Sequence, residues 1–136
     1  MIYLPILFFT LAVAPAVADQ IELNNSIRPA EIDRYGCTIR QRPDHLTFRS
    51  FRDAWRSVAA VDLYSLRRHQ IALDAGSCDC EALWPDWSII EDEFDELGFA
   101  EPTATDSLHI AWSAGEYFPV ISDLRDRLRI QCQEAE

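Results

Sequence analysis

The longest periodic pattern of apolar residues lies between positions 46 and 75. Apolar side chains recur there at steps of three and four, the spacing of one helix face, and arginines lie off that face. Asp44 or Thr47 could cap the start of this helix, and Gly76 would end it. We expect a helix of roughly 28 residues, which a break near Asp62 would shorten. The apolar positions are Phe48, Phe51, Trp55, Ala59, Leu63, Leu66 and Leu73.

A second apolar face lies further along the chain, after a short connector at 77–84. Its members are spaced by three, four and three residues, with acidic residues on the other faces. This spacing predicts a helix that begins at Pro85 or Asp86 and ends at Gly98. The apolar positions are Trp87, Ile90, Phe94 and Leu97.

Two further segments have helical signals. Residues 29–35 start with a proline and precede Gly36, which is typical of a short helix. After a linker at 99–105, Asp106 suits the N-cap of a last helical region, which Pro119 should kink or split. No segment alternates apolar and polar residues as a strand does. The predicted fold class is therefore all-α, a small disulfide-stapled bundle of three to five helices.

Residues 1–18 are predicted to be a secretory signal peptide. The segment is apolar, has no charged side chain and ends in Ala16-Val17-Ala18, an A-x-A cleavage pattern. Residues 19–136 would then form a single secreted helical domain, without stable membrane insertion once the leader is cleaved; a retained leader is the alternative. All twelve basic residues are arginine, which we interpret as the codon bias of a GC-rich bacterial genome. We therefore expect a periplasmic or secreted protein.

Four cysteines, Cys37, Cys78, Cys80 and Cys132, would lie in an oxidising compartment and should be paired. A bond between Cys78 and Cys80 would close a very small, strained ring, so each should bond elsewhere. Two pairings remain open: 37–78 with 80–132, or 37–80 with 78–132. The alternative is a metal-binding or thiol-redox protein that uses Cys78 and Cys80. A four-cysteine zinc site prefers two closely spaced pairs, and Cys37 and Cys132 stand alone.

The net charge of −11 is unevenly distributed. Segment 28–68 has nine arginines against five acidic residues, whereas segment 69–124 has thirteen acidic residues and neither arginine nor lysine. Such a chain lacks the basic surface that nucleic acid needs, so nucleic acid is excluded as a partner. The asymmetry indicates a surface for a protein partner, or two segments that pack together and partly neutralise each other.

We assign the predicted partner-binding surface to Trp84 and to the acidic face of 91–96, with Glu91, Glu93 and Glu96 as its main residues. Tryptophan is enriched at the centres of protein interfaces, and acidic groups steer association with a basic partner. The alternatives are a tryptophan that covers the disulfides and a solvated helix face.

No catalytic residue, cofactor site or metal site is predicted. His45, His69 and His109 lie far apart in sequence, and none belongs to a metal-ligand or nucleophile motif. The acidic run at 91–96 also lacks the alternating oxygen ligands and the loop glycine of an EF-hand.

The stretch Gly76-Ser77-Cys78-Asp79-Cys80-Glu81, followed by Trp84-Pro85-Asp86-Trp87, resembles small periplasmic accessory proteins encoded in alphaproteobacterial type IV secretion or conjugation loci. The resemblance covers about 60 residues. It includes the long helix before this stretch, the acidic helix after it, and a cysteine in the final helix. It implies a helical accessory protein without an active site. We therefore expect a non-catalytic interaction protein of the bacterial cell envelope. The alternatives are a secreted inhibitor of a basic envelope enzyme and the metal or redox protein.

Overall fold

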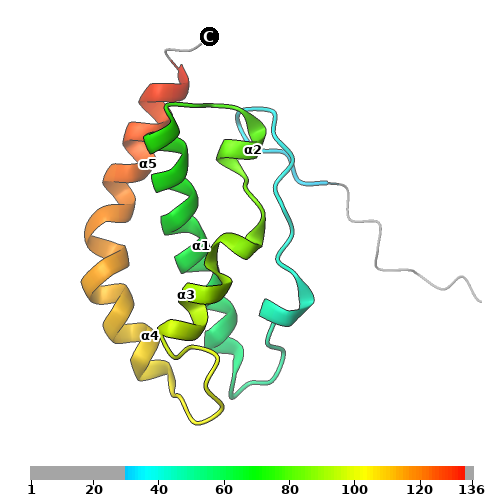
Figure 1. The fold of residues 1–136 in the computed structure, drawn as a ribbon, viewed down its shortest axis with the longest axis vertical. Helices are drawn as coiled ribbons and strands as arrows, with labels where there is room; N and C mark the ends of the chain where they lie inside the picture. Colours follow the sequence, from blue (N-terminus) through cyan, green and yellow to red (C-terminus); the bar gives the residue numbers. More distant parts are fainter. Residues whose placement is uncertain (1–29, 134–136) are drawn as a thin grey trace, which may run out of the picture.

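The computed structural model describes residues 30–133, and every extended regular element in this range is helical (Figure 1). The predicted all-α class is confirmed. The leader predicted at 1–18 lies outside the described residues. The elements are the 3₁₀ turn η1 (Asp44–Leu46), α1 (Ala54–Ala75), α2 (Cys80–Leu83), the 3₁₀ turn η2 (Trp87–Ile90), α3 (Glu91–Glu96), α4 (Asp106–Trp112), the π-helical turn η3 (Ser113–Tyr117) and α5 (Phe118–Gln133).

Two long helical segments form the body of the molecule and run in the same direction (Figure 1). One is α1, and the other is the continuous run α4–η3–α5, which packs along it. The shorter elements α2, η2 and α3 return in the opposite direction on the other side of α1, with the loop 30–53 outside them (Figure 1). This path brings the C-terminal ends of α1 and α5 to the same end of the bundle.

The long predicted helix is shorter than the apolar pattern indicates, because α1 begins at Ala54 and not near residue 46. Ser57 Oγ accepts a hydrogen bond from the Phe48 amide at 2.7 Å and donates one to the Phe48 carbonyl at 3.2 Å. These bonds hold the preceding segment in a non-helical path. Phe51, expected on the apolar face, is fully exposed there. The helix has no break near Asp62.

The predicted end of α1 at Gly76 is confirmed. Gly76 has φ +59°, and its amide bonds to the carbonyls of the last helical turn. An L side chain rarely adopts this left-handed conformation, so glycine suits the position.

The short helix predicted at 29–35 is wrong in the part that the structure describes. Ile32 and Thr38 form an isolated antiparallel bridge around a turn. Asp33 Oδ1 accepts hydrogen bonds from the amides of Tyr35 (2.8 Å) and Cys37 (2.9 Å). A side chain that binds its own backbone in this way favours a turn over a helix.

The predicted second helix is present as η2 followed directly by α3. Asp86 caps η2 by accepting a hydrogen bond from the Ser88 amide at 3.0 Å, and Gly98 follows α3 with φ +77°. Ile90 and Phe94 are almost completely buried, as the pattern predicts.

The last helical region begins one residue earlier than expected, since Thr105 is the N-cap and Asp106, the predicted N-cap, is already the first helical residue. Pro119 does not split the region. It lies in the first turn of α5, directly after the π-helical turn η3. The prolyl ring would clash with the carbonyl four residues back, at Gly115, in a regular α-helix, and that residue belongs to the wider π turn.

The largest group of buried side chains lies between α1 and the returning segment, and two smaller groups include residues of α5. Tyr64 stacks on Trp87 with ring centroids 3.9 Å apart, and its hydroxyl donates to the Pro85 carbonyl at 2.7 Å.

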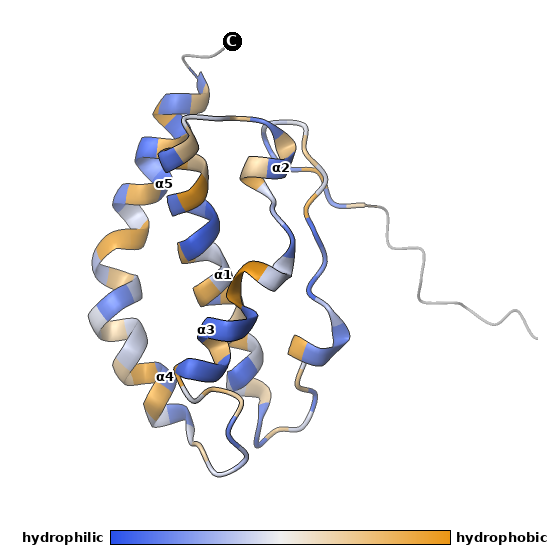
Figure 2. Ribbon diagram, viewed as in Figure 1, coloured by the Kyte–Doolittle hydropathy of each residue, from blue (hydrophilic) through white to orange (hydrophobic). Residues whose placement is uncertain are grey.

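The buried Arg56 guanidinium donates to the carbonyls of Phe99 and Glu101, the latter at 2.6 Å, and so fixes the loop after α3. The hydropathy colours show a largely hydrophilic α3 and an α5 that alternates along its length (Figure 2).

Candidate functional site

The four cysteines form two disulfides at one end of the bundle. Cys37 bonds to Cys80 with Cα atoms 5.2 Å apart, and Cys78 bonds to Cys132 with Cα atoms 5.5 Å apart. This is the second of the two pairings that the sequence leaves open. The connector after α1 is thereby tied to the loop at Cys37 and to the last turn of α5. Disulfides form and persist in oxidising compartments, so the two bridges indicate an extracytoplasmic environment.

Both sulfurs of the Cys78–Cys80 pair are used in these bonds, and the described residues contain no free cysteine. A thiolate metal site or dithiol redox centre at this position would therefore require both bridges to be reduced. Within residues 30–133, no three His, Cys, Asp or Glu side chains gather into a metal-binding group.

Trp84 is half-buried beside the disulfides, with its indole in several intramolecular contacts. Its Nε1 donates to Asp33 Oδ2 at 2.6 Å, and the Arg68 guanidinium lies 3.8 Å from its ring centroid. Both of these contacts are made within the chain, so the indole joins the turn at Asp33 to Arg68 on α1. The role of Trp84 as an anchor for a partner stays a prediction. Only the exposed part of the side chain is available for such a contact.

The acidic residues of α3 divide into two groups. Glu91 accepts a hydrogen bond from His45 at 2.7 Å, in the loop before α1. Glu93 accepts two hydrogen bonds from Arg67 on α1, one of them at 2.7 Å, and this contact raises the pKa of the Arg67 guanidinium above its ordinary value. Glu91 and Glu93, two of the predicted partner-binding residues, therefore hold α3 against the rest of the fold.

The other group faces solvent. Glu96, the third predicted residue, is exposed, and so are Asp92 and Asp95, which we did not single out from the sequence. None of the three forms an ion pair with another described residue. Spacing alone does not separate the two groups, because Asp95 follows Glu91 by four residues and Glu96 follows Glu93 by three. What distinguishes them is the presence of His45 and Arg67 beside Glu91 and Glu93.

The structure does not bring Trp84 and α3 into one site. Trp84 lines hollows together with Asp33 and with Thr38, whereas Glu91 lines hollows together with His45. The predicted surface is thus two separate places on the molecule.

The three histidines occupy three separate positions. His45 contacts Glu91, and His109 Nε2 lies 2.9 Å from Asp62 Oδ2. His69 is buried in α1, where its Nδ1 lies 2.6 Å from the Ser65 carbonyl oxygen, and burial lowers its pKa to about 4. Each contact joins parts of the fold to one another.

Comparison with known proteins gives no match: neither a protein-family model, nor a curated protein, nor a solved structure is similar to this chain. Among residues 30–133, no helix has the length and apolar composition needed to cross a bilayer.

Proposed function

We propose that this chain is a secreted, non-catalytic interaction protein of the bacterial cell envelope, and that it binds a basic protein partner through the exposed side of α3. The observation that carries the proposal is the division of the α3 carboxylates. Glu91 and Glu93 are paired within the fold, while Asp92, Asp95 and Glu96 point away from it without ion-pair partners among the described residues.

The anchoring of α3 makes this surface rigid. Phe94 is 2% exposed and belongs to the core, and the contacts to His45 and Arg67 hold the helix on two further sides. A rigid charged surface loses little conformational freedom on binding, and its field accelerates encounter with a partner of opposite charge.

Two sets of charge reversals test this surface. The first changes Asp92, Asp95 and Glu96 to arginine, and the second changes the exposed residues Asp74, Glu81 and Asp123 to arginine. Both sets shift the net charge equally. Photo-crosslinking from position 92 or 96 in intact cells should give a discrete adduct, and pull-down of the identified protein should be lost only in the first set. Equal binding by both sets would contradict the proposal.

The accessory role in a type IV secretion apparatus is the most specific setting that we propose, and it is supported by the sequence resemblance at 76–87. In that setting, the crosslinked partner would be an envelope component of the apparatus. A partner unrelated to secretion would remove this setting and leave the interaction function in place.

A secreted inhibitor of a basic envelope enzyme is the second candidate, and the same unpaired carboxylates favour it. An inhibitor would reduce the activity of a purified peptidoglycan hydrolase, and the inhibition would weaken with salt because exposed charges are screened. A chain that binds its partner without reducing its activity would exclude this candidate.

A further inference from the structure

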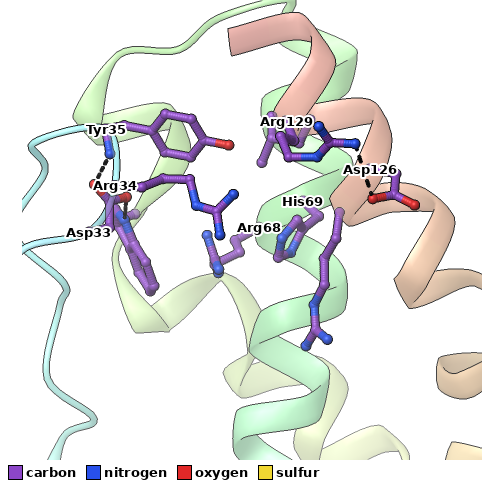
Figure 3. Close-up of a pocket in the computed structure, with 10 residues that line it drawn as sticks. Asp33, Arg34, Tyr35, Arg68, His69, Asp126 and Arg129 are labelled. Atoms are coloured by element: carbon purple, nitrogen blue, oxygen red, sulfur yellow. Dashed lines mark hydrogen bonds and ion pairs between the residues drawn. The ribbon is translucent and has the colours of Figure 1, made fainter. Parts of the chain in front are cut away.

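A cleft with several cationic side chains lies at the disulfide end, remote from the α3 surface. It has a volume of about 380 Å³ and is bordered by the turn at 33–35, by α1 and by α5. Arg34, Arg68, Arg125 and Arg129 contribute to its walls. Arg34 and Arg68 extend toward its centre from opposite walls, with His69 next to them (Figure 3). A chain with a net charge of −11 thus places a third of its twelve arginines around one hollow.

The carboxylates of this cleft are engaged elsewhere. Asp33 accepts hydrogen bonds from Tyr35, Cys37 and Trp84, so both of its oxygens are occupied. Asp126 pairs with Arg129 on the same helix at 3.6 Å. Within residues 30–133, no carboxylate oxygen lies within 4.0 Å of the guanidinium nitrogens of Arg34, Arg68 or Arg125. Three positive charges in the cleft therefore lack a negative partner in this part of the chain.

Arg68 is held in place by neutral groups of the chain. Its guanidinium stacks on the Trp84 indole at 3.8 Å, and its Nη1 donates to the Leu83 carbonyl at 3.0 Å. Burial, together with the nearby charge of Arg125, lowers the pKa of Arg68. Arg125 is fixed in turn by a hydrogen bond of 3.2 Å to the Tyr117 hydroxyl. A cation that is removed from water and held by neutral groups gains more from an anion than an exposed one does.

We propose that this cleft binds the phosphate group of a small soluble compound. Two guanidinium groups that extend into one cleft from opposite walls, those of Arg34 and Arg68, suit a tetrahedral, doubly charged oxyanion, because each can donate to a different oxygen. The buried His69 is neutral near pH 7 and leaves the charge of the cleft to its arginines. The excess of acidic residues over the whole chain opposes approach to an extended anionic surface, so a small compound is the occupant rather than a phospholipid membrane.

Titration with inorganic phosphate at constant ionic strength tests the site, followed by the chemical shifts of the arginine side chains. The oxidised chain should show saturable shifts at Arg68, and affinity should fall about tenfold for each guanidinium removed in Arg34→Gln and Arg125→Gln. These two arginines are exposed, so the variants should keep their fold. Arg68→Gln should abolish the remaining binding, provided that its amide spectrum is native-like.

The matched control is the double variant Arg49→Gln and Arg127→Gln, which removes the same charge from exposed positions outside the cleft. Its phosphate affinity should equal that of the parent chain. Vesicles containing phosphatidic acid should not bind more than phosphatidylcholine vesicles. The proposal is overturned if the shifts do not saturate, if the Arg34 and Arg125 variants bind as well as the control, or if only vesicles bind. None of these outcomes depends on the α3 surface.

Discussion

Glu93 on α3 and Arg67 on α1 are joined by two hydrogen bonds between carboxylate and guanidinium. The pair orients α3, because it fixes one side of the helix while Phe94 anchors the apolar side. One member of a predicted contact surface is thus a structural residue. The exposed carboxylates of the same short helix, Asp92, Asp95 and Glu96, form no ion pair with another described residue.

A double-mutant cycle on Glu93→Gln and Arg67→Met should give a coupling free energy of about 1 kcal/mol, since bidentate pairs exceed single exposed ones but both side chains remain partly solvated. Urea unfolding of the four proteins supplies the values. The control is the exposed pair Asp123–Arg127, with 3.6 Å between its charged atoms, for which we expect about 0.3 kcal/mol. Equal coupling in both cycles would refute the anchoring role of Glu93.

Removal of either disulfide should strongly destabilise the fold. The bridges span 43 and 54 residues, and the chain-entropy relation gives about 4 kcal/mol for each loop. Replacement of both cysteines of one bridge by serine, followed by urea unfolding, measures this loss. Because total stabilities of small domains are about 5–15 kcal/mol, either double variant should be only marginally folded. A loss below about 1 kcal/mol would show that the bridges do not hold the bundle together.

Asp33→Ala should destabilise the turn before Cys37 and free the indole of Trp84. The carboxylate accepts two backbone hydrogen bonds and the Trp84 Nε1 bond at 2.6 Å, and we expect a loss of about 2 kcal/mol in unfolding free energy. A shift in tryptophan fluorescence should accompany it. The control Asp44→Ala removes an almost completely exposed carboxylate and should change neither quantity. An Asp33 variant with the stability of that control would contradict the role assigned to Asp33.

The buried His69 should make stability depend on pH. Its pKa is about 4 in the folded chain, lowered by burial and then by the charge of Arg68, against 6.5 as the ordinary value. The neutral form is therefore favoured by folding. The contribution of the neutral imidazole to the free energy of unfolding is fully present above pH 6.5. It falls by at most about 1.4 kcal/mol per pH unit as the pH decreases, and it is lost once the pH has passed below about 4.

Urea unfolding at pH 7 and pH 5 tests this assignment. The parent chain should lose more stability between these values than His69→Leu does, by about 2 kcal/mol. The difference between the two proteins is the relevant quantity, because carboxylates titrate in both. An identical pH dependence in the two proteins would show that folding does not lower the pKa of the His69 imidazole.

Much of the fold follows from apolar spacing, since Trp87, Ile90 and Phe94 form one buried face and Gly76 and Gly98 end helices with positive φ. The errors have a common physical cause. Polar side chains of Asp33 and Ser57 bond to nearby backbone and replace helical hydrogen bonds, and a periodic pattern gives no indication of such bonds.

The candidate sites were only partly predictable. The sequence limits the disulfides to two pairings, and the choice between them depends on which side of the connector faces α5. Glu91, Glu93 and Glu96 are equivalent as acidic residues, and only the positions of His45 and Arg67 separate them into paired and exposed. The arginine cleft combines residues 34, 68, 125 and 129, which are distant in sequence and meet through tertiary packing alone.

Both proposals depend on the disulfide framework, because it indicates an extracytoplasmic environment and ties together the segments that border the cleft. Digestion of protein isolated from the envelope fraction, without reduction, by a protease that cleaves before aspartate tests it directly. Cleavage before Asp79 separates Cys78 from Cys80. We expect peptide 33–43 to be linked to 79–85, and 74–78 to be linked to 126–136. Free thiols at these cysteines, or a link between 33–43 and 74–78, would contradict the account.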